Sequence, residues 1–117
     1  MLRVAVVGLG FMGRMHLRCY RQIDDVEVTA VCERDTGRLA GQVTGNIAGA
    51  EEALNLDGVR VYDDFKKMLA EEELDAISIA LPTYMHRQFT VEALEAGVAV
   101  LCEKPMAVTL ADCEAMM

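Results

Sequence analysis

The chain has 117 residues, which is enough for one domain and too few for two. Hydrophobic residues make up 53% and charged residues 26%, a balance that indicates a globular domain with a core and excludes a disordered chain. The formal net charge of -8 argues against nucleic acids and membrane surfaces as partners, although backbone N–H groups can still bind a small anionic cofactor.

The first apolar run, residues 2–7, contains Arg3 and is typical of a strand rather than of a targeting signal. No apolar stretch approaches the roughly 20 residues of a membrane-spanning helix. The cysteines form no C-x-x-C pair and lie in apolar segments, so we expect buried, reduced thiols in a cytoplasmic protein, with no disulfide and no metal site. They are Cys19, Cys32, Cys102 and Cys113.

Residues 2–32 predict a strand–helix–strand unit. The Val-rich run at 2–7 ends at Gly8, and apolar residues at helical spacing predict a helix over about 11–22. The β-branched run at 26–32 predicts a second strand. After Glu33 the helical pattern weakens, and glycines recur every fourth residue from 37 to 49. These glycines indicate either close backbone packing or a short frayed helix that runs into a loop.

Strands and helices continue to alternate in the second half. We expect strands at 59–62, 74–81 and 98–102. Asp63 is the predicted cap of a helix through Phe65 and Leu69, and Thr83 that of a helix ending at Gly97. Thr109 with Asp112 resembles a capping box that opens a last helix. That helix shows no stop signal up to Met117, so we expect residues 1–117 to be the N-terminal domain of a longer protein.

This alternation predicts a doubly wound parallel sheet of the Rossmann type, with helices on both faces. Ligands of such sheets bind beyond the carboxyl ends of the strands. Those ends lie at Gly8, Glu33, Leu81–Pro82 and Glu103–Lys104.

The turn after the first strand reads Gly8-Leu-Gly10-Phe-Met-Gly13, a G-x-G-x-x-G motif. It follows a strand, opens a helix and precedes an acidic residue, Glu33, by twenty positions, which is the context of a dinucleotide-binding fingerprint. Gly8 permits a tight turn, Gly10 lets a diphosphate approach the backbone, and Gly13 lets the helix pack closely. A glycine turn without a ligand is the alternative.

Glu33 and Arg34 bear on the choice of cofactor. A carboxylate at the end of the second strand accepts hydrogen bonds from the ribose hydroxyls and repels a 2′-phosphate, which favours NAD over NADP. Arg34 complicates this interpretation, because a guanidinium pairs with a 2′-phosphate or stacks on adenine. Both residues also fit as solvated loop charges.

Lys104 follows the fifth strand within Glu103-Lys104-Pro105, where it can donate to a substrate hydroxyl or carbonyl. An ordinary exposed turn lysine is the alternative, and the Lys104–Pro105 bond can be cis. His16 and His86 each lie in an early turn of a predicted helix, and each is either a hydrogen-bonding group near the cofactor or a packed histidine.

Taken together, these residues resemble the N-terminal domain of the Gfo/Idh/MocA oxidoreductases, named after glucose–fructose oxidoreductase, inositol dehydrogenase and a rhizopine-catabolism protein. Three blocks carry the resemblance, and they span nearly the whole chain. They are residues 4–16, residues 61–65 with the following helix, and residues 75–83 with His86, 93–97 and 100–105.

The resemblance implies an NAD(P)-dependent oxidoreductase acting on sugars, inositols or related compounds, with its substrate pocket and an acid/base histidine in a second, C-terminal α/β domain. It implies that Lys104 reaches the substrate oxygen and that Glu103 lies by the nicotinamide ribose. Glu33 and Arg34 would meet the adenosine ribose. The other implied cofactor contacts are Gly8, Gly10, Phe11, Met12, Leu81, Pro82, Thr83 and His86.

Two other classes share this fold. One is a non-catalytic nucleotide-binding or oligomerisation module, and the other is an FAD or S-adenosylmethionine protein, against which the Glu-Lys-Pro turn argues. We expect residues 1–117 alone to bind a dinucleotide without turnover. Apolar surface left by the last helix also predicts a homo-oligomer.

Overall fold

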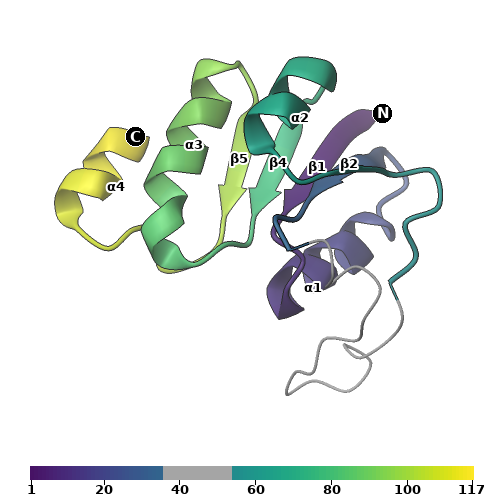
Figure 1. Ribbon diagram of the computed structural model, residues 1–117, viewed down its shortest axis with the longest axis horizontal. Helices are drawn as coiled ribbons and strands as arrows, with labels where there is room; N and C mark the ends of the chain where they lie inside the picture. The colour runs from purple at the N-terminus through teal and green to yellow at the C-terminus, as the bar shows by residue number, and fades with distance from the viewer. Residues whose placement is uncertain (36–53) are drawn as a thin grey trace.

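The computed structural model describes residues 1–35 and 54–117, which form five strands and four α-helices (Figure 1). Strands and helices alternate along the described chain, except that no described helix separates the second strand from the third. The glycine-rich segment at 37–49, for which we expected either close backbone packing or a short frayed helix, lies outside the described residues. The strands are β1 (Leu2–Val7), β2 (Val26–Cys32), β3 (Arg60–Tyr62), β4 (Ala76–Ile79) and β5 (Ala99–Cys102). The helices are α1 (Phe11–Tyr20), α2 (Phe65–Glu71), α3 (His86–Glu95) and α4 (Leu110–Met116).

The strands form one parallel sheet in the order β3-β2-β1-β4-β5, which confirms the predicted doubly wound Rossmann fold. The strand order reverses at β1: the chain moves outward on one side through β2 and β3 and then crosses to the other side of β1 for β4 and β5. Ligands of such sheets bind at this reversal, beside the carboxyl end of β1.

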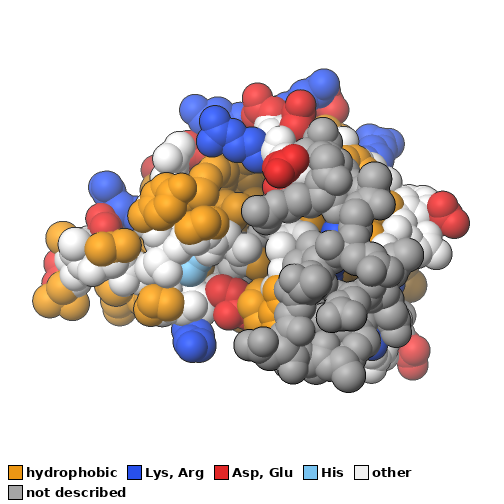
Figure 2. All heavy atoms as spheres, turned by 60° about the horizontal axis from the view of Figure 1, so that its bottom comes forward, with side chains coloured by type: hydrophobic (Ala, Val, Ile, Leu, Met, Phe, Trp, Pro, Cys, Tyr) orange, Lys and Arg blue, Asp and Glu red, His pale blue; other side chains and the backbone are white. Residues whose placement is uncertain are grey.

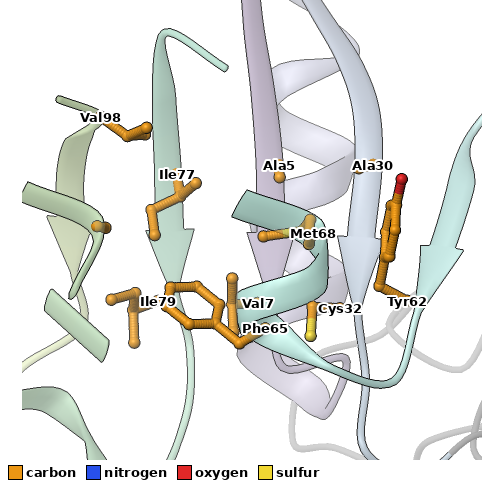
Figure 3. Packing of buried hydrophobic residues seen from close by; sticks show 11 residues of the cluster. Ala5, Val7, Ala30, Cys32, Tyr62, Phe65, Met68, Ile77, Ile79 and Val98 are labelled. Carbon is orange, nitrogen blue, oxygen red and sulfur yellow. The ribbon is translucent and has the colours of Figure 1, made fainter. Parts of the chain in front are cut away.

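The two faces of β1 carry two separate cores, because successive side chains of a strand point to opposite faces. Val4 and Val6 pack with Leu17 of α1. Ala5 and Val7 belong to the other core, together with Phe65 of α2 and residues of β4 and α3 (Figure 3). A strand buried on both faces needs a continuous apolar run, which explains the sequence of residues 4–7.

The pairing of β1 with β2 contains one irregularity. Val4 pairs with Val28, but the next residue, Ala5, pairs with Ala30, so Thr29 is an extra residue in β2. This bulge changes the face of the sheet to which the later side chains of β2 point. Val28 and Val31 therefore both reach the α1 core although three positions separate them, and Ala30 reaches the opposite core.

Some helix ends differ from the predictions. Asp64, not Asp63, caps α2 by accepting a hydrogen bond from the Lys67 amide at 3.1 Å. Thr83 caps no α-helix: it begins a 3-10 turn over Thr83–Met85, and α3 follows without a side-chain cap. Thr109 caps α4 as predicted, since its hydroxyl accepts from the Asp112 amide at 3.1 Å, but the Asp112 carboxylate of the predicted capping box lies 3.5 Å from Nε of Arg87. Gly97, with φ +81°, ends α3 as predicted.

None of the helices in the described part of the chain is long and apolar enough to cross a membrane. The four cysteines are free thiols. Cys32 is buried as expected. Cys19 is exposed on α1, and Cys102 and Cys113 are only partly buried, so the expectation of four buried thiols holds for Cys32 alone.

Candidate dinucleotide site

Backbone hydrogen bonds just beyond the sheet align the carboxyl ends of the strands. The Gly8 amide donates to Cys32 O at 2.8 Å and the Glu33 amide to Tyr62 O at 2.8 Å. On the other side of β1, Ala80 donates to Val7 O at 2.8 Å and Glu103 to Ile79 O at 3.0 Å. The predicted site segments therefore meet along one edge of the sheet.

The glycine turn requires its glycines for two different steric reasons. Gly8 has φ +89°, and a Cβ at this position would lie 2.5 Å from Ala80 O. A Cβ on Gly13 would lie 1.6 Å from Gly8 O, so α1 packs directly on the turn. Gly10 is the N-cap of α1 and has no capping side chain. The first turn of the helix thus presents backbone N–H groups at the carboxyl edge, which is the arrangement that binds a diphosphate.

The carboxylate of Glu33 lies buried beneath this turn, with a residue exposure of 6%. Oε1 accepts a hydrogen bond from the Leu9 amide at 3.0 Å, and Oε2 accepts one from the Asp35 amide at 3.0 Å. A carboxylate has about four acceptor positions, and hydroxyl groups such as those of a ribose are donors that it can accept. Glu33 therefore joins the end of β2 to the glycine turn, and it also lines the crevice described next.

A crevice of about 520 Å³ opens between the glycine turn, the end of β2 and the segment after β4. Figure 2 looks toward this end of the molecule and shows hydrophobic side chains gathered near charged ones. The volume falls in the range of small-molecule and cofactor sites. The crevice is lined by Gly8, Gly10, Glu33, Arg34, Asp35, Ala80, Leu81, Pro82, Tyr84 and Met85.

A second, more apolar pocket of about 230 Å³ adjoins the crevice and shares Arg34, Leu81 and Met85 with it. Phe65 and Phe89 line it and contact each other edge to face, with ring centroids 4.7 Å apart. Apolar walls with charged residues at the rim suit a flat aromatic ring.

Cys32 also lines this apolar pocket. Burial, with nearby Glu33 as a lesser cause, raises the pKa of its thiol to about 12. The group therefore stays neutral at physiological pH and behaves as part of the apolar wall rather than as a nucleophile.

The turn after β5 holds Glu103 and Lys104, followed by a cis Lys104–Pro105 bond. Glu103 is oriented by α1, because its Oε1 lies 2.6 Å from Nε2 of His16. Lys104 is exposed and forms no hydrogen bond or ion pair with the described residues. Among the described residues, no partner therefore fixes the Lys104 amine.

His86 is almost fully buried, with an exposure of 1%. Its Nε2 lies 2.8 Å from Leu81 O, while Nδ1 lies 3.0 Å from Pro105 O and 3.2 Å from Met106 O. Both ring nitrogens are thus occupied by backbone carbonyls. Of the two predicted roles, this geometry matches that of a packed histidine.

The structure brings part of the predicted set together at the crevice: Gly8, Gly10, Glu33, Arg34, Leu81 and Pro82. Others lie elsewhere along the same edge. Met12 lies with His16 and Leu101 in an apolar groove beside α1, and Gly13 is buried under the turn. Phe11, Thr83, His86, Glu103 and Lys104 do not line the crevice.

Sequence reasoning missed the apolar pocket. Phe65 and Phe89 carry the same helical periodicity as ordinary core residues, so no local signal marked them as pocket walls. Asp35 and Tyr84 were missed as crevice residues, although each lies within two positions of a predicted contact. Proximity to the strand ends was the one signal that pointed to them.

Residues 2–117 match a family model described as an oxidoreductase family with an NAD-binding Rossmann fold, GFO_IDH_MocA. The chain belongs to this family. Among its relatives is D-apiose dehydrogenase from Paraburkholderia graminis, 41% identical over 113 residues, a match that covers 97% of this chain and 28% of the relative. The resemblance stated from the three sequence blocks is thereby confirmed.

Solved structures of similar proteins have closely matching folds. Myo-inositol 2-dehydrogenase from Lactobacillus plantarum gives a TM-score of 0.79 at 34% identity, covering 98% of this chain and 31% of the other. The WlbA dehydrogenase from Bordetella pertussis, solved with NADH and UDP-GlcNAcA, gives 0.80 at 29% identity, covering 98% and 32%. The chain thus spans about a third of the length of these relatives.

Proposed function

We propose that this chain is the NAD-binding domain of an oxidoreductase that transfers a hydride between a nicotinamide cofactor and a sugar, inositol or related polyol. The observation that carries the proposal is the glycine cradle, in which a Cβ on Gly13 would meet Gly8 O at 1.6 Å, with the buried Glu33 carboxylate beside it. The family description, and a WlbA relative solved with NADH, support the cofactor.

The residues present fit a dinucleotide. The N-terminal turn of α1 and Gly10 would hold the diphosphate through backbone N–H groups, and Glu33 would accept from a ribose hydroxyl. The apolar pocket beside Phe65 suits the adenine ring. NAD supplies the hydride chemistry when it is bound, at nicotinamide C4.

The chain's own part in the reaction is proton handling and orientation. Lys104 would hold the substrate oxygen by donating a hydrogen bond, and it would help move the proton that leaves or joins that oxygen. Glu103, fixed by His16, would orient the nicotinamide ribose. The substrate pocket would come from a further domain, in line with the larger size of the relatives, of which D-apiose dehydrogenase and myo-inositol 2-dehydrogenase suggest the substrate class.

Calorimetric titration with NAD and NADP tests the proposal. We expect NAD to bind more tightly by roughly tenfold or more, because a 2′-phosphate near the buried Glu33 carboxylate meets like-charge repulsion of about 1–4 kcal/mol. Equal or tighter binding of NADP would show that Arg34 rather than Glu33 sets the preference. Absence of binding by either would contradict the proposed function.

The alternative is a non-catalytic nucleotide-binding module. Turnover by a form of the protein that includes a substrate domain separates the two, because only the oxidoreductase would show it. We propose in addition a cytoplasmic location, which the free thiols support, and self-association, which exposed apolar side chains on and before α4, such as Val108 and Leu110, support. Size-exclusion chromatography tests the latter, and a clean monomer would contradict it.

A further inference from the structure

His86 connects two segments that both belong to the proposed site. Its Nε2 faces Leu81 O, in the segment that lines the crevice and the apolar pocket. Its Nδ1 faces Pro105 O and Met106 O, directly after Lys104. His86 begins α3 and is 1% exposed, so water does not compete for these bonds.

Among the described residues, backbone hydrogen bonds between the segment after β4 and the segment after β5 end just before the residues that His86 contacts. The Glu103 amide donates to Ile79 O, and the chains then diverge into the turn at 104–106 and the 3-10 turn at Thr83–Met85. The next links between the segments are those of the His86 ring. The turn that carries Lys104 is therefore held by His86 from one side, while His16 holds Glu103 from the other.

The chemistry of these bonds constrains the side chain. A carbonyl oxygen only accepts, so each ring nitrogen that bonds must carry hydrogen, and both bonds form together only in the ring that carries two N–H groups. Among uncharged side chains, a primary amide is the one that also offers two N–H donors from one atom. An apolar side chain of similar size fills the space and offers none.

We propose that His86 is a positioning residue: by bridging Leu81 O and Pro105 O it fixes the Glu103–Lys104 turn against the crevice, and so sets the orientation of the nicotinamide half of the cofactor. This inference rests on the proposed function. His86 acts through the turn and does not touch the dinucleotide.

A pair of variants separates hydrogen bonding from packing. H86Q and H86M have unbranched side chains of similar length, but only glutamine supplies two N–H donors. Calorimetry gives the Kd of each variant for NAD and for ADP-ribose, which lacks the nicotinamide. We expect H86M to keep its affinity for ADP-ribose while its preference for NAD over ADP-ribose falls about tenfold, the equivalent of about 1.4 kcal/mol. H86Q should recover part of that preference.

A purely structural role would instead weaken both ligands equally, and that result would overturn the inference. An H86Q that behaves like H86M would also overturn it. Failure of the unsubstituted chain to bind ADP-ribose would contradict the proposed function itself.

A measurement on the unsubstituted chain covers the case in which H86M does not fold. In an NMR titration, NAD should shift the Lys104 amide and the His86 ring signals, while ADP-ribose should leave them in place. Identical shifts with both ligands, or no shift with either, would overturn the inference.

Discussion

Nε2 of His16, in α1, lies 2.6 Å from the carboxylate of Glu103, which follows β5 at the other side of the sheet edge. The two side chains are 13% and 21% exposed, so the pair is largely shielded from water. A contact between residues 87 positions apart joins the first helix to the turn that carries Lys104. It makes the orientation of Glu103 depend on α1.

This pair should show measurable coupling. In a double-mutant cycle with H16A and E103A, we expect an interaction of about 0.5–3 kcal/mol in the free energy of unfolding, measured by urea denaturation. Lys66 and Glu92 provide the control, because their 3.9 Å contact involves a lysine side chain that is 78% exposed. Such surface pairs contribute about 0–1 kcal/mol. Equal coupling energies in the two cycles would contradict the conclusion that His16 orients Glu103 in a contact largely shielded from water.

Glu33 should matter for stability as well as for cofactor choice. E33A leaves the buried Leu9 amide without its acceptor, so we expect a loss of about 1–3 kcal/mol in the free energy of unfolding. E27A, an exposed position of the same strand, should change it by less than about 0.5 kcal/mol. We also expect E33A to narrow the preference for NAD over NADP. An unchanged preference would separate the structural role of Glu33 from its proposed role at the ribose.

The glycine turn provides a matched pair of substitutions. Gly8 and Gly58 both have positive φ, at +89° and +78°, but a Cβ on Gly58 meets nothing within 4 Å. G58A should therefore cost only the backbone strain, about 1–2 kcal/mol, and leave dinucleotide binding intact. G8A adds the clash with Ala80 O, so we expect it to lose more stability and to abolish binding. Similar losses from G8A and G58A would argue against the close packing described here.

The buried thiol of Cys32 predicts a decline in stability at alkaline pH. Its pKa is about 12 in the folded chain against 9.0 as the unperturbed value. Between these values the unfolded chain binds fewer protons than the folded one, so the free energy of unfolding falls as pH rises from about 9 to about 12.

Urea denaturation across this pH range checks the prediction. C32A should show a shallower decline than the unsubstituted chain, although it starts from a lower stability because of the lost packing. C102A, which removes a less buried thiol, should change the slope less. The same slope in C32A and in the unsubstituted chain would contradict the assigned pKa.

Much of the fold was predictable from local patterns, because the strands that are buried on both faces must be apolar and the turns between them need glycine or capping residues. The N-terminal ends of α2 and α3 were not predictable in this way. Asp63 and Asp64 are both capable caps, and the sequence does not separate a 3-10 turn at Thr83 from the first turn of a helix.

The site was predictable where it depends on backbone geometry, as at Gly8 and Gly13, and less so where it depends on distant contacts. Nothing near His86 in the sequence identifies Pro105 and Met106 as its partners, because that contact forms only when α3 packs beside the turn after β5. The same holds for His16 and Glu103. Local pattern marks candidate residues, whereas tertiary packing decides which atoms they meet.

The bulge at Thr29 bears on how relatives of this chain are detected. Without Thr29, β2 would pair with β1 in an unbroken register, and Glu33 would keep its place beside Leu9. The hydroxyl of Thr29 is buried and has no hydrogen-bond partner among residues 1–35 and 54–117, so its loss removes no polar contact found there. A family member one residue shorter in this strand would therefore build the same crevice with nineteen positions, not twenty, between the third glycine and the acid. Searches that demand a fixed spacing would overlook it.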